Sequence, residues 1–181
     1  MQGLVDAEGR PVRRAMSYME RRAKDELKKG MAYGLQIAGT NVLKLLKSLA
    51  ITGAVAASVK DPVWKYKWVE HNEPEVYKKV YKWLDVKEFL ICQCTGEFVM
   101  THDSAYASLL YDTLKGRGGF SREICKMLGI NMAHLPRIIQ SSDIAGTITR
   151  ESAAQLHLKE GIPVFGGGGD ASLIDIGDAR G

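Results

Sequence analysis

The residue pattern with the most chemical content lies near the end of the chain, where four glycines precede an aspartate. Residues 162–165 form a short apolar stretch that predicts a buried strand. The four glycines, residues 166–169, and then Asp170 follow it directly. Glycines let the backbone turn tightly and approach a ligand, and a carboxylate after a strand is held on a rigid element. Such an aspartate could accept the proton of an alcohol during phosphoryl transfer. A turn followed by a helix cap explains the same pattern without chemistry.

Residue spacing disfavours three other chemistries. The glycine run lacks the G-x-x-x-x-G-K-[ST] pattern of a phosphate-binding loop, so a P-loop NTPase is not expected. His102, Asp103 and Ser104 are the residue types of a hydrolase triad, but sequence neighbours do not normally converge with triad geometry. The histidines and cysteines lack the spacing of metal ligands, so no metal site is predicted.

Composition indicates a globular chain that binds neither nucleic acid nor membrane. With 181 residues, 45% of them hydrophobic, the chain can bury one sizeable core. Its 25 Lys and Arg residues exceed its 21 Asp and Glu residues by four, and they are scattered, which argues against nucleic acid as a partner. Polar residues interrupt the longest apolar run, at residues 45–59, so no membrane span is expected. The start does not resemble a signal peptide, which favours a cytoplasmic protein.

The elements that must position the glycine run begin with a hairpin, predicted around a turn at residues 6–9. Ser17 and Glu20 have the spacing of a capping box. This spacing predicts a helix over residues 21–29, and Gly30 is expected to end it.

The rest of the chain alternates helix and strand signals. Further helices are predicted at residues 42–49, from Pro62, from Pro74, at 86–94, at 121–128 and at 150–158. The helix from Pro74 is expected to place Val76, Val80 and Trp83 on one face. Strands predicted at residues 144–149 and 162–165 give the last third an α/β character.

Several segments together resemble the FGGY family of carbohydrate kinases. Residues 163–170, Pro-Val-Phe-Gly-Gly-Gly-Gly-Asp, are similar to the family's glycine-rich segment that ends in the catalytic aspartate. Residues 87–97 resemble its helix and Leu-Thr-Gly-Glu turn, and residues 101–112 resemble Thr-Asp-x-Ser-x-Ala with a later Asp; both are interpreted as mainly structural. Residues 1–3, Met-Gln-Gly, are similar to the segment against the sugar, and residues 20–22 to the nearby Asp-x-Arg element.

The resemblance implies ATP-dependent phosphorylation of a sugar hydroxyl, with ATP and magnesium acting in the full-length enzyme and a sugar or polyol as partner. The residues that it implies are Asp170 as catalytic base, Met1, Gln2, Glu20 and Arg22 at the substrate, and Gly168 and Gly169 at the cofactor. Within the family, the sequence is nearest the xylulose kinases, which favours xylulose as substrate. Another pentulose or a polyol remains an alternative, and a homodimer remains open.

The resemblance also implies an incomplete actin-like ATPase or ribonuclease-H-like α/β domain. Residues 1–181 are expected to be part of an N-terminal domain, without its opening strands, their Asp-x-Gly-Thr phosphate loop, or a second domain. The chain by itself is therefore expected to be inactive, and a non-catalytic sugar-binding remnant is the alternative. Glu20 stands where the family has Asp, and Asp175 where it has a small residue, which leaves the choice of sugar open.

Overall fold

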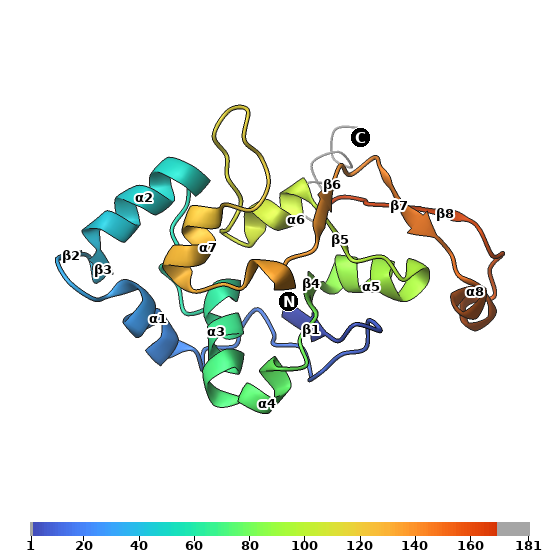
Figure 1. The fold of residues 1–181 in the computed structure, drawn as a ribbon, viewed down its shortest axis with the longest axis horizontal. Helices are drawn as coiled ribbons and strands as arrows, with labels where there is room; N and C mark the ends of the chain where they lie inside the picture. Colours follow the sequence, from blue (N-terminus) through green and yellow to red (C-terminus); the bar gives the residue numbers. More distant parts are fainter. Residues whose placement is uncertain (1, 170–181) are drawn as a thin grey trace, which may run out of the picture.

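A computed structural model describes residues 2–169. The chain forms an elongated mixed α/β structure (Figure 1). The helices that gather at one end are α1 (Lys24–Met31), α2 (Val42–Thr52), α3 (Pro62–Asn72), α4 (Pro74–Tyr77) and α7 (Arg122–Leu128). The other end consists of helices α5 (Val86–Thr95) and α8 (Arg150–Leu156) and strands β7 (Ile144–Thr147) and β8 (Pro163–Phe165). In the described part of the chain, no helix is long and apolar enough to cross a membrane.

Strand β1 (Gln2–Val5) pairs antiparallel with β4 (Lys82–Asp85), with Leu4 opposite Trp83. The predicted turn is present, because the Gly9 amide donates to the Asp6 carbonyl at 3.0 Å. The chain that returns from this turn forms only an isolated bridge to β1, so the main partner of β1 lies far along the sequence.

The structure corrects the helix predicted from Pro74. Helix α4 (Pro74–Tyr77) ends after four residues, and Trp83 belongs to strand β4. The helical spacing of Val76, Val80 and Trp83 was misleading, because pairing with β1 buries the adjacent Trp83 and Leu84 in an extended conformation.

The predicted capping box is also wrong. Helix α1 (Lys24–Met31) begins after Ala23, which makes no side-chain cap. Ser17 Oγ accepts from the Met19 amide instead, and Glu20 Oε1 accepts from the amides of Arg21 and Arg22. These short-range bonds build turns and compete with a helix start.

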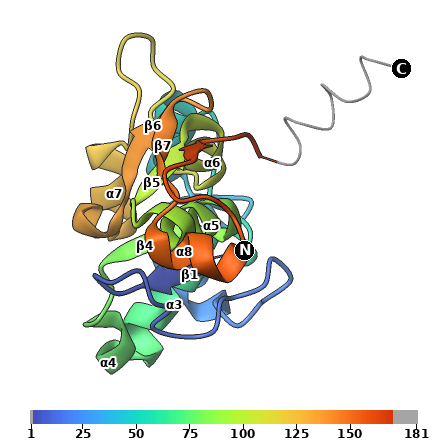
Figure 2. The same ribbon diagram turned by 90° about the vertical axis from the view of Figure 1, so that its right-hand side faces the viewer.

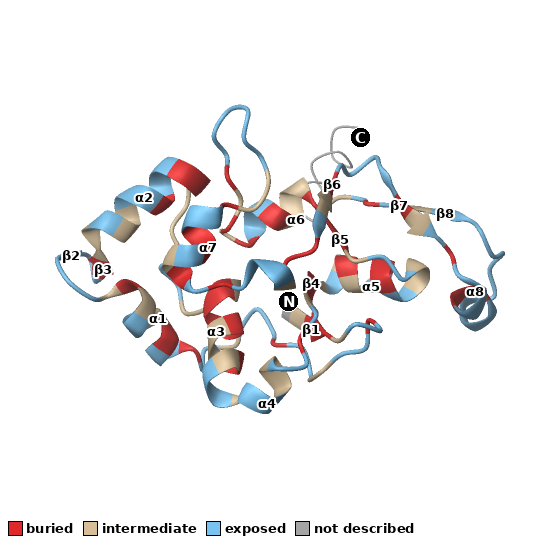
Figure 3. Ribbon diagram, viewed as in Figure 1, coloured by how far each residue is buried: buried red, intermediate tan, exposed pale blue. Residues whose placement is uncertain are grey.

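Gly30 lies inside α1 rather than ending it. A Cβ atom built on Gly30 would stand 2.2 Å from the indole ring of Trp64, which is 1% exposed in α3 (Pro62–Asn72). Glycine is therefore required at this position for close packing between α1 and α3, and not for a helix stop. Buried residues of α1, α3 and α7 (Arg122–Leu128) form this core (Figure 3).

The other predicted helices are confirmed within a few residues. They are α2 (Val42–Thr52), α3, α5 (Val86–Thr95), α7 and α8 (Arg150–Leu156). Strands β7 (Ile144–Thr147) and β8 (Pro163–Phe165) are confirmed and pair antiparallel. The predicted burial of β8 is wrong: Pro163 and Phe165 are exposed and Val164 is half-buried, because among the described residues β8 pairs only with β7. Elements that the sequence did not indicate are β2 (Gln36–Ile37), β3 (Thr40–Asn41), β5 (Val99–Thr101), α6 (His102–Ala107), a 3₁₀ turn at Met132–His134 and β6 (Arg137–Ile139).

Strand β5 pairs parallel with β6, and this pair carries α6 directly after β5. Helix α5 lies between the β1–β4 pair and the β5–β6 pair (Figure 2). As a result, the first turns of α5 and α6 come close to the end of β8, where the glycine run begins.

Candidate functional site

The glycine run forms one wall of a cleft of about 860 Å³. The other lining residues come from the ends of β4 and β8 and from helices α5 and α6. The lining residues are Asp85, Val86, Lys87, Glu88, Leu90, Ile91, Cys94, Asp103, Ser104, Ala107, Val164, Phe165 and residues 166–169. The lining of the cleft therefore combines apolar side chains with several charged ones.

Lys87 connects the start of α5 to the start of the glycine run. Its Nζ donates to the Gly166 carbonyl at 3.0 Å and to Thr101 Oγ1 at 2.7 Å. The same Nζ lies 2.8 Å from Glu88 Oε1, and the Glu88 side chain is 0% exposed. Apart from this ion pair, neither Glu88 oxygen has a hydrogen-bond partner among the described residues. The ammonium group of Lys87 is therefore the charge that compensates this buried carboxylate.

Asp103, at the start of α6, binds the other end of the run. One carboxylate oxygen accepts from the Gly169 amide and the other from the Thr101 hydroxyl. Burial acts to raise the pKa of Asp103, but the hydrogen bonds from Thr101 and Gly169 outweigh it, and the pKa is lowered. Asp103 is therefore ionised at neutral pH.

Asp85 is a second unusual carboxyl group in the cleft. It lies opposite Gln2 in the β1–β4 pair, and its Oδ1 is buried with no partner among the described residues. Burial raises the pKa of Asp85 to about 6, and the nearby charge of Glu88 adds to this shift. The charge of Asp85 consequently changes near neutral pH.

The structure brings only some of the predicted site residues together. Gly168 and Gly169 line the cleft, whereas Glu20 and Arg22 do not. Asp170 and Met1 lie outside the described residues, and only the backbone of Gln2 is placed, beside Asp85. The roles assigned to these residues stay predictions.

Glu20 and Arg22 pair with each other on the segment that leads into α1. Arg22 donates to Glu20 at 2.7 Å, and its guanidinium lies 4.9 Å from the centre of the Trp68 ring. The hydrogen bond from Arg22 lowers the pKa of Glu20 to about 2, so this carboxylate is ionised. The pair is preformed, with both charges on a turn stabilised by Trp68.

The described residues do not fit a magnesium site. No group of three His, Cys, Asp or Glu side chains in residues 2–169 could hold a metal ion. The Gly169 amide already donates to Asp103, so a phosphate could use that amide only by displacing the carboxylate. No step of a reaction is therefore assigned to a metal in this part of the chain.

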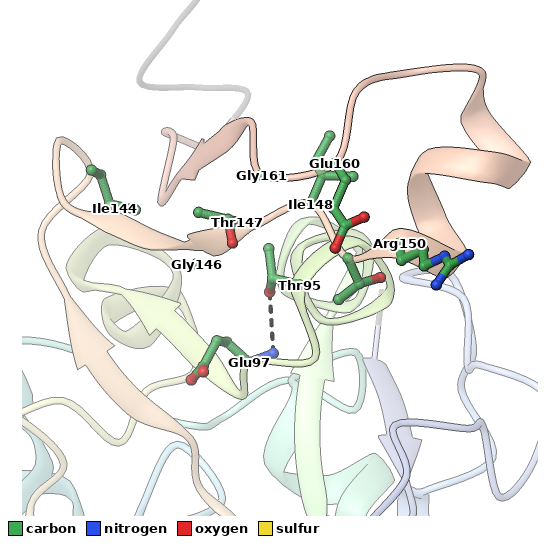
Figure 4. Close-up of a pocket in the computed structure, with 10 residues that line it drawn as sticks. Thr95, Glu97, Ile144, Gly146, Thr147, Ile148, Arg150, Glu160 and Gly161 are labelled. Carbon is green, nitrogen blue, oxygen red and sulfur yellow. Dashed lines mark hydrogen bonds between the residues drawn. The ribbon is translucent and has the colours of Figure 1, made fainter.

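A second hollow lies between the end of α5 and strand β7, and Figure 4 shows its lining. Thr95 Oγ1 accepts from the Glu97 amide at 3.1 Å, as the dashed line in Figure 4 marks. A Cβ on Gly146 would stand 2.9 Å from Thr95 Cβ, so the turn packs directly on β7. The lining of this hollow includes none of the predicted site residues that the structure describes.

Sequence reasoning missed Lys87, Glu88, Asp103 and Asp85 as cleft residues. The segments that hold Lys87 and Asp103 were interpreted as structural, because nothing local shows that both reach the glycine run. One signal was available. The segments at residues 87–97 and 101–112 resemble the same family as the glycine run does, and each has a charged residue, Lys87 or Asp103, at its start.

The fold defines the class of protein: the chain has the N-terminal part of the actin-like fold of sugar kinases. It superposes on Plasmodium falciparum glycerol kinase with ADP with a TM-score of 0.81 and 20% identity, over 98% of this chain and 34% of that one. A xylulose kinase from Lactobacillus acidophilus gives a TM-score of 0.79 at 19% identity, over 97% of this chain and 34% of that one. At these identities the likeness shows the fold alone.

The chain belongs to the FGGY family of carbohydrate kinases, because residues 2–177 match the N-terminal domain of that family. It is 30% identical to the xylulose kinase of Lactococcus lactis subsp. lactis (strain IL1403) over 139 residues, which is 77% of this chain and 26% of that protein. It is also 30% identical to the L-fuculokinase of Escherichia coli (strain K12) over 128 residues, 71% of this chain and 26% of that protein. The chain thus spans about a quarter of the length of these relatives.

Proposed function

We propose that this chain supplies the sugar side and the catalytic base of an ATP-dependent sugar kinase. The observation that carries the proposal is the glycine run, whose two ends are bonded to α5 and α6 directly before Asp170. In this role the Asp170 carboxylate accepts the proton of the sugar hydroxyl as that oxygen attacks the terminal phosphoryl group of ATP. Gly168 and Gly169 would lie near the nucleotide.

The proposed substrate is xylulose, which becomes xylulose 5-phosphate. Similarity to xylulose kinases supports this choice, and Met1, Gln2, Glu20 and Arg22 are the proposed sugar contacts. The preformed pair of Glu20 and Arg22 offers an acceptor and donors for hydroxyl groups. L-Fuculose is the second candidate, because the fuculokinase relative is equally similar at 30% identity.

Calorimetric titration of the purified chain with xylulose, L-fuculose and glycerol tests this proposal. We expect xylulose to bind best, and we expect Asp170→Ala to weaken its binding about tenfold, the effect of losing one hydrogen bond to a charged group. A parallel titration with ATP and magnesium separates nucleotide binding from sugar binding.

The control is Glu123→Gln, which changes an exposed carboxylate on α7 that is absent from the cleft lining and should leave sugar binding unchanged. A variant chain that is folded by circular dichroism is required for each comparison. Failure of the folded chain to bind any of the three would rule out a sugar site in this segment. Tighter binding of L-fuculose than of xylulose would replace the proposed substrate.

A further inference from the structure

Gly166, at the start of the glycine run, is buried, and both of its backbone polar groups are hydrogen-bonded. The Gly166 amide donates to the Asp143 carbonyl at 3.0 Å, and the Gly167 amide donates to the Ser141 carbonyl at 2.9 Å. A Cβ on Gly166 would stand 2.7 Å from the Gln140 carbonyl oxygen and 2.7 Å from Thr101 Cγ2. Lys87 binds the remaining polar group of Gly166, its carbonyl, at 3.0 Å. This end is therefore held by both backbone and side chain.

The far end of the run has a side-chain partner of its own. The Gly169 amide donates to Asp103, whose carboxylate oxygen would stand 3.1 Å from a Cβ at position 169. A hydrogen bond to an ionised acceptor is about twice as strong as one between neutral groups. Asp103 is thus well suited to hold a segment whose glycines have unusual backbone freedom.

One residue couples these two contacts. The Thr101 hydroxyl accepts from Lys87 Nζ at 2.7 Å and donates to Asp103. Glu88, which is fully buried, forms an ion pair with the same Lys87 Nζ at 2.8 Å. Side-chain contacts therefore run without a break from Glu88 through Lys87 and Thr101 to Asp103. Lys87 binds the first glycine of the run and Asp103 binds the last.

We propose that Lys87 and Asp103 are positioning residues that fix the two ends of the glycine run and so determine where the next carboxylate, Asp170, is presented. This proposal rests on the proposed role of Asp170 as catalytic base. Lys87 and Asp103 belong to the first turns of two helices, which are rigid supports, whereas the run has no side chains of its own to pack. A misplacement of about 1 Å at a reacting group can reduce a rate about a hundredfold.

The hydrogen bond from the Gly169 amide to Asp103 is called the tether below. It is tested by amide hydrogen exchange and by the pH dependence of the Gly169 amide resonance in the ¹⁵N-labelled chain. We expect Asp103→Ala to increase the exchange rate of Gly169 about tenfold. We expect the Gly169 resonance of the unchanged chain to titrate with an apparent pKa below that of an ordinary aspartate, since the Asp103 pKa is lowered. Asp103→Asn should remove this titration but keep slower exchange than Asp103→Ala, because its amide oxygen still accepts.

Local and global effects are separated by a reference site. The Ile124 amide, which Ser121 caps at the start of α7, should keep its exchange rate in Asp103→Ala. Exchange at Gly169 within twofold of the unchanged chain, or an equal increase at Ile124, would overturn the tether. The hydrogen bond from Lys87 to the Gly166 carbonyl is tested by the exchange rate of the Gly167 amide, which belongs to the same peptide group. The variant for this test is Lys87→Met/Glu88→Leu, which removes the buried charge pair as a unit.

A double-mutant cycle tests whether Asp103 acts through Asp170. Sugar binding is measured by calorimetry for Asp103→Ala, Asp170→Ala and their combination. We expect the combined variant to bind no more weakly than Asp170→Ala alone, because misplacing an absent side-chain acceptor has no further effect. Additive losses would show that Asp103 does not position Asp170. If no sugar binds while the exchange results hold, the proposed function fails and the tether stands.

Discussion

Replacing Lys87 with methionine is expected to lower the free energy of unfolding by about 3 to 5 kcal/mol, because it leaves a buried carboxylate without its counter-charge. Glu88 is 0% exposed, and neither of its oxygens has a hydrogen-bond partner among the described residues, so Lys87 at 2.8 Å is its main compensation. Methionine retains most of the length of the lysine side chain, so the loss of packing is small. Urea unfolding followed by tryptophan fluorescence gives the change in free energy.

Two controls define this effect. The Lys87→Met/Glu88→Leu double variant should recover most of the stability, because apolar replacement of a whole buried ion pair is often neutral. Lys78→Met removes an ion pair of similar length, 2.6 Å to Glu75, in which both side chains are more than two-thirds exposed. This control should change stability by less than about 1 kcal/mol. A cost of Lys87→Met no larger than that of Lys78→Met would contradict the buried-pair account.

Asp85→Asn is expected to stabilise the chain at pH 7.5 by about 2 to 3 kcal/mol and to have little effect at pH 4. Burial raises the pKa of Asp85 to about 6 in the folded chain, from an ordinary value of 3.8. A folded pKa above the unfolded one contributes stability that is fully present below about pH 4 and is lost as the pH rises through 6. Asparagine stays neutral and avoids this loss. Urea titrations of both chains at pH 4, 5, 6 and 7.5 measure the difference.

Glu20→Gln supplies a control of opposite sign. The hydrogen bond from Arg22 lowers the pKa of Glu20 to about 2, so its contribution is present above the ordinary carboxyl pKa and is lost as the pH falls through 2. Glu20→Gln should therefore destabilise the chain at pH 7.5, where Asp85→Asn stabilises it. An Asp85→Asn effect that is the same at pH 4 and pH 7.5 would refute the raised pKa.

The helices that could be predicted from the sequence are those whose ends are determined by their own residues. Helix α7 begins where Ser121 accepts from the Ile124 amide, and it ends at Gly129 in the left-handed conformation. Helix α5 ends in the same way at Gly96, which has a φ of 77°. A cap and a stop lie within one turn of the helix that they limit, so sequence alone reveals them.

Two of the predictions that failed depended on contacts between distant segments. Trp83 fits a helical pattern with Val76 and Val80, but strand pairing with residues at the start of the chain places it in β4. Gly30 has the usual position of a helix stop, but the Trp64 ring is what requires a glycine there. In each case a tertiary contact outweighed a local preference.

The sequence by itself determined that a glycine run follows a strand and precedes Asp170, and it identified the family through segments spread along the chain. Only the tertiary structure decided that Lys87 and Asp103 hold this run. Lys87 and Gly166 are 79 residues apart and Asp103 and Gly169 are 66 apart, so no local pattern links them. They meet because α5 lies between two strand pairs, which brings the first turns of α5 and α6 to the end of β8. Packing of whole elements, rather than the preference of any residue, therefore builds the cleft.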